Sequence, residues 1–342
     1  MKENNTWWTF LTPFFAAHGY TLYAPVGDHA SEDSHPHPLD EMPTSRQVHP
    51  FARRLYSKNK DTGFTLGPCL RGARDKYGRD FVIRIVSGPI RSTEVEVLQR
   101  LTSPSALRDP RNITIPILEW LEFDGLVFIV MPRWDYAWIH DFGTVAECIH
   151  IAEVSLAYLD FLHEHRIAHM DIHDGNMMIN TIVPALRFHL TGLRDPAETR
   201  YAMIDFEGSY IYPYETPLDE VSVVFPGYSW GAHGLNGEEG PFNPFAADVG
   251  ALGYLLDQRV RVIREVVPEI IPFTEWMRSL SKASSERPTA REAYTRFQEL
   301  KSKLTEEQLK APVKDLSYSQ GAYQKKYIYK SRPQLPKHNW SP

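Results

Sequence analysis

The stretch Ile167–Ile179 reads IAHMDIHDGNMMI and decides how the rest of the chain is interpreted. An apolar pair leads into a polar loop whose His and Asp side chains can move a proton or bind a metal. The apolar run Met177–Ile179 leads out of the loop, and we expect it to form a short buried strand. Taken alone, the loop is equally compatible with ordinary hydrogen-bonding residues, so its meaning depends on the segments that follow.

Three segments follow this loop in a fixed order. Tyr201–Gly208 (YAMIDFEG) reads as a strand that ends in Asp-Phe, Asp248–Gly253 begins an apolar helix, and Glu286–Ala290 (ERPTA) opens another helix. Together with the loop they stand in the order found in eukaryotic protein kinases. From about Tyr56 to Leu300 the chain therefore resembles the protein kinase superfamily, and the catalytic-loop spacing of Asp-x-x-x-x-Asn is its best match.

The resemblance implies an α+β fold with the two lobes of a protein kinase. We expect a small β-rich N-lobe over residues 51–131 and a larger helical C-lobe over residues 135–304, which together form a kinase-like domain. An N-terminal extension with a His- and Pro-rich loop would occupy residues 1–50. A basic tail at residues 305–342 shows no periodicity and predicts disorder.

The resemblance also assigns roles to individual residues. Asp171 would be the catalytic base for an acceptor hydroxyl, while Asn176 and Asp205 would hold magnesium on the phosphates of ATP. Arg84 stands where kinases place the lysine that contacts these phosphates. Glu94 stands where kinases place the glutamate that orients that lysine.

A hairpin and a short helix carry this second pair of residues. Ala73–Val86 reads as two strand-like halves around polar turn residues. Thr93 followed three residues later by Glu96 has the spacing of a capping box, so we expect Thr93 to cap a helix. We expect an Arg84–Glu94 salt bridge, with Glu96 as the rival partner because the connection is short.

The segment Gly63–Leu70 occupies the place of the kinase glycine-rich loop. Gly63 and Gly67 are the candidate phosphate-contacting residues, because glycine lets backbone N–H groups approach phosphate oxygens closely. Thr65 replaces the second glycine of the motif and Pro68 the third, and proline offers no N–H. We therefore expect this loop to bind phosphate poorly.

The connection between the lobes is expected beside Met131. Ile113–Leu118 and Leu126–Met131 read as strands, and the second continues into a Pro-Arg-Trp segment. By resemblance this segment is the hinge, with Met131 as gatekeeper and Arg133 as a further nucleotide-contacting position. A long amphipathic helix is then predicted over Thr144–His165, with Thr144 as its cap.

Further helices are predicted at Asp248–Val267, Phe273–Lys282 and Arg291–Leu304. At the N-terminus, Thr12 is a candidate cap for a helix that starts at Pro13 and stops at Gly19. A strand is expected at Tyr20–Tyr23. Trp7–Tyr23 carries no charged residue, and we favour packing on the core over a membrane or partner surface, since a membrane-surface helix would carry Lys or Arg.

Several departures from the kinase pattern leave three functions open. The first is a magnesium- and ATP-dependent kinase that phosphorylates a protein Ser or Thr hydroxyl. The second is a pseudokinase that acts as a binding or scaffold module, favoured by Thr65, Pro68, Arg84, Glu207 and the short segment between Asp248 and the ERPTA motif. The third is a small-molecule kinase of the choline kinase or aminoglycoside phosphotransferase type, favoured by His173 and Glu207. Met170 replaces the arginine that reads a phosphorylated activation loop, so that mode of activation is not expected.

Composition narrows the class of protein. A net charge of -6 argues against a general nucleic-acid binder. The kinase resemblance implies a protein substrate or binding partner. Cys69 and Cys148 form no CxxC pair, which predicts a reducing compartment without disulfides or a thiolate zinc site. No apolar run is long enough to span a bilayer, and no secretory signal is recognisable. We therefore expect a cytoplasmic, intracellular protein.

Overall fold

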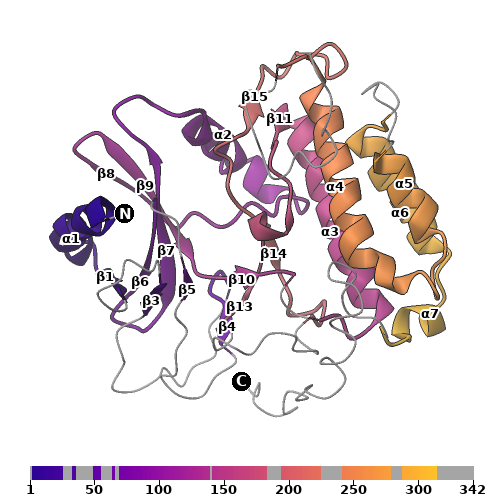
Figure 1. Ribbon diagram of the computed structural model, residues 1–342, viewed down its shortest axis with the longest axis horizontal. Helices are drawn as coiled ribbons and strands as arrows, with labels where there is room; N and C mark the ends of the chain where they lie inside the picture. Colours follow the sequence, from indigo (N-terminus) through magenta and orange to yellow (C-terminus); the bar gives the residue numbers. More distant parts are fainter. Residues whose placement is uncertain are drawn as a thin grey trace.

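The computed structural model describes residues 2–25, 33–35, 49–54, 64–65, 69–138, 141–182, 194–224, 241–278 and 287–313. The fold is mixed α+β, as expected. Figure 1 shows a curved sheet with helix α1 on its outer side and a group of long helices, α3 to α6, on the other side of the molecule. No helix in the described ranges is long and apolar enough to cross a membrane.

The main sheet has five strands in the order β1-β6-β7-β9-β8, and all its neighbours are antiparallel. The strands are β1 Thr21–Leu22, β6 Leu70–Arg74, β7 Asp80–Ser87, β8 Glu119–Phe123 and β9 Leu126–Pro132. The predicted hairpin over Ala73–Val86 is confirmed as β6 and β7. Its turn contains Gly78 with φ of 74°, and the Asp75 carboxylate accepts the backbone N–H groups of Tyr77 and Arg79.

The strand predicted at Ile113–Leu118 is wrong, because the strand that pairs with β9 is β8, Glu119–Phe123. Residues 113–115 are used elsewhere. The Ile115 N–H donates to the carbonyl of Met203 at 3.0 Å, and the Met203 N–H donates to the carbonyl of Ile113 at 2.8 Å. This segment therefore ties the main sheet to the second half of the chain.

Helix α1 spans Lys2–Ala17, so the prediction that Thr12 caps a helix starting at Pro13 is wrong. Thr12 lies inside the helix and its hydroxyl donates to the carbonyl of Trp8 at 3.1 Å. Gly19, with φ of 88°, follows the end of the helix as predicted. The predicted packing on the core is confirmed, since Trp8, Leu11 and Phe15 of α1 are buried against strands of the main sheet.

Helix α2, Thr93–Leu101, follows β7 and lies beside it. The residue at its N-cap position is Ser92, not Thr93 as predicted, and Ser92 makes no side-chain capping bond. The Ser92 hydroxyl instead donates to the carbonyl of Val86, which fixes the chain between β7 and the helix. The buried face of α2 carries Glu94 together with apolar side chains.

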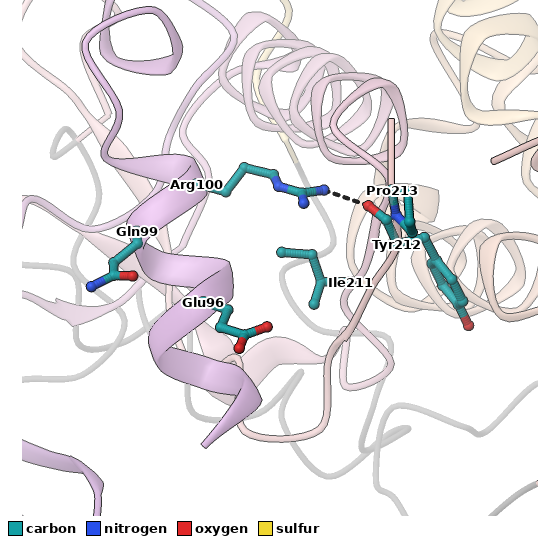
Figure 2. A pocket seen from close by; sticks show the side chains of 6 residues that line it. All are labelled: Glu96, Gln99, Arg100, Ile211, Tyr212 and Pro213. Atoms are coloured by element: carbon teal, nitrogen blue, oxygen red, sulfur yellow. Dashed lines mark hydrogen bonds between the residues drawn. The ribbon is translucent and has the colours of Figure 1, made fainter. Parts of the chain in front are cut away.

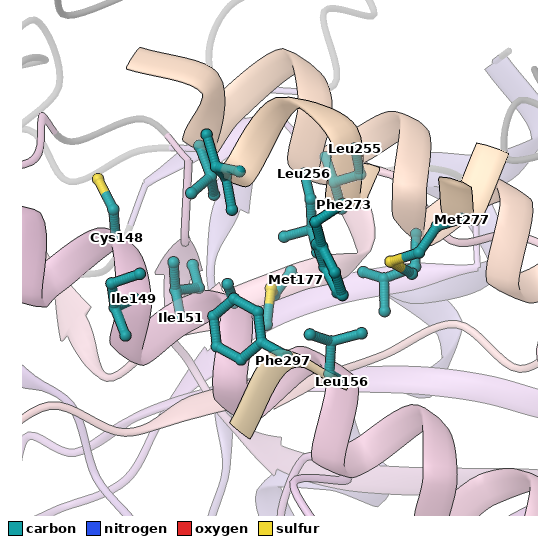
Figure 3. Close-up of a cluster of buried hydrophobic side chains, with 14 of the residues drawn as sticks. Cys148, Ile149, Ile151, Leu156, Met177, Leu255, Leu256, Phe273, Met277 and Phe297 are labelled. Atoms are coloured by element: carbon teal, nitrogen blue, oxygen red, sulfur yellow. The ribbon is translucent and has the colours of Figure 1, made fainter. Parts of the chain in front are cut away.

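Four helices, α3 to α6, build the helical core, and Figure 3 shows side chains from these helices packed together with Met177; the short helix α7 packs against this core. The five helices are α3 Val145–Glu164, α4 Pro244–Val260, α5 Ile270–Arg278, α6 Ala290–Ser302 and α7 Glu306–Lys310. Thr144 is at the N-cap position of α3, as predicted. Helix α4 begins four residues before the predicted Asp248, because the Asn243 side chain accepts the Ala246 N–H and Pro244 occupies the first turn.

Helix α7 and the residues after it belong to the fold, although we expected the tail to begin at residue 305. The Val145 N–H donates to the carbonyl of Ala311 at 3.0 Å, and the Val313 N–H donates to the carbonyl of Gly143 at 3.1 Å. Val313 is buried in the helical core. The rest of the predicted tail, residues 314–342, lies outside the described ranges, so its disorder stays a prediction.

Short strands lie between the main sheet and the long helices (Figure 1). Strands β10, β12 and β14 (Asp135–Tyr136, Met177–Ile179, Tyr201–Met203) form one small sheet, and β11 pairs with β15 (Ile167–Ala168, Tyr210–Ile211). Strand β12 is fully buried, as predicted. Other short strands are β13 Thr181–Ile182 with β4 Arg53–Arg54, and β2 Ala24–Pro25, β3 Asp33–His35 and β5 Phe64–Thr65. The polar loop therefore starts and ends on buried strands.

Candidate functional site

Asp248 of helix α4 anchors the backbone of the polar loop through hydrogen bonds. The carboxylate of Asp248 accepts the backbone N–H of His169 at 2.6 Å and that of Met170 at 2.8 Å. It also lies 3.3 Å from Nε2 of His163, and it is buried. Met170 has φ of 65°, a conformation that costs energy in a non-glycine residue and is stabilised here by these bonds.

Asp171 and Asn176, the two best-matched residues of the loop, are in direct contact. Nδ2 of Asn176 donates to Oδ2 of Asp171 at 2.9 Å and to its backbone carbonyl at 3.0 Å. Both of these partners can only accept, so the amide nitrogen must face Asp171. The carbonyl oxygen of Asn176 then faces away from Asp171 and is the atom that could ligate a cation.

His173 lies next to the same carboxylate oxygen as Asn176, with Nε2 3.4 Å from Oδ2 of Asp171. Hydrogen bonding to Asp171 and then to Asp174 raises the pKa of His173 to about 9. Nδ1 accepts the Gly175 N–H at 2.9 Å, so in this geometry the ring proton sits on Nε2 and points at Asp171. When Nδ1 also carries a proton, it can no longer accept the Gly175 N–H. It would then donate to the carboxylate of Asp174, whose Oδ1 is 3.7 Å away.

Asp174 is itself fixed by a residue from a distant part of the chain. Interaction with the protonated His173 ring is the main factor that lowers the pKa of Asp174 to about 2, and the charge of Arg259 adds to it. Arg259 lies near the end of α4 and is in ion-pair contact with Asp174. Both Asp248 and Arg259 come from α4, so this one helix anchors the loop at two points.

A second group of charged side chains surrounds Arg84 of strand β7. Arg84 Nη2 lies 2.7 Å from Oδ1 of Asp205 and 3.3 Å from Oε2 of Glu207, and Nε lies 3.2 Å from Oε1 of Glu94. The predicted Arg84–Glu94 salt bridge is confirmed. Its rival Glu96 is exposed and lies on another side of α2.

Three carboxylates against one guanidinium leave this group short of positive charge. The pKa of Glu94 is raised to about 7, mainly by burial and also by the negative charges of Asp205 and Glu207, which together outweigh the lowering effect of Arg84. The pKa of Arg84 is raised by the same carboxylates despite its burial. The electrostatics thus favour either a proton on Glu94 or an additional cation near Asp205.

Backbone hydrogen bonds bring the two groups together. The Ile204 N–H donates to the carbonyl of Asn176 at 3.0 Å, and Nε2 of His169 is 3.1 Å from the carbonyl of Ile204. Asp205, with φ of 68°, is the next residue, and its strained backbone turns the chain at this point. Asp171, Asn176 and Asp205 therefore belong to one region of the molecule.

The site offers two side-chain oxygen ligands to a hard divalent cation. Asp205 and Asn176 supply the carboxylate and amide oxygens that magnesium prefers, and the Asp205 side chain is 32% exposed. Within the described ranges, no group of three or more His, Cys, Asp or Glu side chains is arranged to hold a metal. Magnesium commonly keeps several waters and binds through one or two carboxylates plus phosphate, so this finding is compatible with such a site.

The two residues predicted to contact the nucleotide base, Met131 and Arg133, have side chains that are buried inside the protein. The side chain of Met131 is buried in a core cluster. Arg133 is also buried, its backbone N–H donates to the carbonyl of Asp80 at 3.0 Å, and its guanidinium donates to the Tyr23 hydroxyl at 3.3 Å. A contact of Arg133 with a base would have to use its carbonyl oxygen. Gly63 and Gly67 lie outside the described residues.

The two anchors from α4 were not identified as site residues from the sequence. Asp248 was recognised only as the start of an apolar helix, yet a single carboxylate in such a run signals a buried polar partner. Arg259 had no comparable signal, because its contact with Asp174 depends on how α4 lies across the loop. The chain matches no family model, and no curated protein matches it.

Proposed function

We propose that this protein is a phosphotransferase with a two-lobed, protein kinase-like fold, which uses magnesium and ATP to phosphorylate a protein hydroxyl. The observation that carries the proposal is the contact of Asn176 with Asp171 in a loop whose backbone is bonded to Ile204, next to Asp205 and its partner Arg84. A base, two oxygen ligands and a cation for phosphate are the groups that this chemistry requires.

Each of these residues has a definite task in the proposed reaction. Asp171 orients the acceptor hydroxyl and takes its proton, and Asn176 keeps the Asp171 carboxylate in place. Asn176 and Asp205 would hold magnesium, and Arg84, oriented by Glu94, would contact the phosphates. Magnesium and ATP, when bound, supply the phosphoryl group and neutralise charge that develops on its oxygens. The excess of carboxylates around Arg84 supports this assignment, because a divalent cation would offset it.

A binding module without catalysis, a pseudokinase, is the second candidate. It is favoured by the three ion pairs of Arg84, since a guanidinium engaged by Glu94, Asp205 and Glu207 must give up contacts before it can bind phosphate. The planar guanidinium also does not substitute directly for a compact ammonium between two phosphates.

A thermal-shift titration with ATP, with and without magnesium, followed by a phosphate-transfer assay, separates these functions. We expect magnesium-dependent stabilisation by ATP and phosphate transfer that Asp171→Asn abolishes while nucleotide binding remains. Asp124→Asn, in an exposed turn between β8 and β9, is the control and should keep full activity. Binding without turnover in the parent protein would select the pseudokinase, and absence of nucleotide binding would overturn the phosphotransferase.

A further inference from the structure

A cavity of about 340 Å³ opens between helix α2 and the end of β15 with the two residues after it. It is lined by Glu96, Gln99, Arg100, Ile211, Tyr212 and Pro213. Figure 2 shows the Glu96 carboxylate and the Ile211 side chain within the space that separates the two walls. None of these residues belongs to the site described above, so the cavity needs a separate explanation.

Glu96 has no hydrogen-bond or ion-pair partner among the residues that the structure describes. Arg100 lies one helical turn further along α2 and would ordinarily pair with it. Arg100 instead donates to the carbonyl of Tyr212 at 2.6 Å and to that of His165 at 2.9 Å, and its guanidinium lies 4.6 Å from the centre of the Tyr214 ring. The positive charge that Glu96 could have used is therefore directed to the opposite wall (Figure 2).

The opposite wall belongs to a strongly acidic part of the chain. The sequence contains no Lys or Arg between Arg200 and Arg259. Glu215, Asp219 and Glu220, which follow the wall residue Pro213, are all exposed. These three carboxylates outnumber the two guanidinium groups, of Arg100 and Arg166, that donate to the backbone carbonyls of Tyr212 and Thr216, so the segment favours additional positively charged groups.

We propose that the cavity is a docking site for an arginine side chain presented by a basic segment of a partner protein. The planar guanidinium can pair with both oxygens of the Glu96 carboxylate, and Ile211 and Pro213 offer apolar surface to the arginine stem. The acidic residues after Pro213 would accept further basic groups of the same segment. Because one wall is α2, which also carries Glu94, the docked arginine would hold α2 against the segment Ile211–Pro213.

Methyl NMR of the full chain tests this directly and needs neither nucleotide nor activity. Protein with ¹³C-labelled isoleucine methyl groups is titrated with N-acetyl-arginine methylamide, and the Ile211 signal is assigned with Ile211→Val. The matched probe is N-acetyl-citrulline methylamide, which keeps the shape and removes the charge. We expect the arginine probe to shift the Ile211 signal with a Kd of about 1–10 mM and the citrulline probe to have at least tenfold weaker effect.

The variant Glu96→Gln should abolish the shift, while Glu122→Gln should preserve it. Glu122 is also an exposed glutamate but lies on β8, away from the cavity. Higher salt should weaken binding of the arginine probe, because the contact is electrostatic and close to solvent. Equal shifts by both probes, an unchanged shift in Glu96→Gln, or no shift up to about 50 mM probe would each overturn the proposal. Binding is read without ATP, so failure of the proposed phosphotransferase does not affect the result.

Discussion

Arg84 is the residue on which most of the site depends. Its guanidinium contacts three carboxylates from two places in the chain: Glu94 on α2, and Asp205 and Glu207 in the loop after β14. Arginine suits this role because its donors point in several fixed directions, whereas an ammonium is a single point charge on a flexible stem. Arg84 thus joins the main sheet, α2 and the loop after β14 through side chains alone.

The variant Arg84→Lys should destabilise the protein, because a lysine cannot keep all three contacts. A charge-assisted hydrogen bond contributes roughly 1.5–3 kcal/mol, and we expect the free energy of unfolding to fall by about that amount. Urea denaturation measures it, with Arg108→Lys as an exposed control that should change stability by less than about 0.5 kcal/mol. Tighter magnesium-ATP binding by Arg84→Lys at unchanged stability would instead indicate that position 84 serves nucleotide binding more than structure.

Glu94 should make the protein less stable as the pH rises, which is the opposite of the usual effect of a carboxylate. Its pKa is about 7 in the folded protein and 4.5 in the reference state, so the folded protein binds this proton more tightly than the unfolded chain. Its contribution to stability is fully present below pH 4.5 and is lost as the pH rises to about 7.

The corresponding free-energy change is at most about 1.4 kcal/mol per pH unit for one proton. We expect denaturation between pH 4.5 and 7 to give a more negative slope of unfolding free energy against pH for the parent than for Glu94→Gln, which cannot titrate. Asp205 and Glu207 stay in place in this variant and provide the common background. Parallel slopes for the two proteins would contradict the raised pKa of Glu94.

At the scale of elements, helix α1 is an integral part of the main sheet. Pro13 inside it removes one backbone hydrogen bond, which is why the sequence favoured a helix that began there. The helix continues through this position because Trp8, Leu11 and Phe15 are all buried against the strands. Packing of one face here outweighs a local preference of the backbone.

Truncation of the Phe15 side chain should therefore destabilise the main sheet as well as helix α1. Phe15 is fully buried and its ring lies 5.2 Å from that of Phe128 on β9. We expect Phe15→Ala to lower the free energy of unfolding by about 3–5 kcal/mol, measured by urea denaturation. Phe10→Ala is the control, since Phe10 is 63% exposed on the same helix, and it should cost less than about 1 kcal/mol. Similar losses for both variants would mean that α1 does not pack as described.

At the scale of the whole molecule, the sequence predicted contacts between neighbouring elements better than those between distant ones. The Arg84–Glu94 pair was predicted because the kinase resemblance aligns these two positions with a lysine–glutamate pair, and the short connection between them left Glu96 as a rival. The error at Ile113–Leu118 arose because residues 113–115 pair with Met203, far along the chain, and no local pattern encodes that pairing. The residues after Lys310 were misassigned for the same reason, since Val313 is buried against distant helices.

Asp248 offers the strongest test of how the helical core supports the loop that contains Asp171. Both oxygens of its carboxylate are needed, because the N–H groups of His169 and Met170 each use one. The variant Asp248→Asn replaces one acceptor by a donor and leaves one of these buried N–H groups without a partner. Such a loss costs about 1–3 kcal/mol, and the backbone around the strained Met170 should open more often.

Amide hydrogen exchange of the segment 168–172 measures this opening, and the control is Asp257→Asn on the same helix. Asp257 is also buried, but its ion pairs with Arg261 and Arg278 support α5 and not the loop. Both variants should be less stable than the parent, but only Asp248→Asn should speed exchange in the loop beyond the change in global stability. Phosphate transfer, if the proposed function holds, should fall with Asp248→Asn because Asp171 is the next residue after Met170. Equal protection of the loop in the two variants would show that α4 supports it through apolar packing and not through this carboxylate.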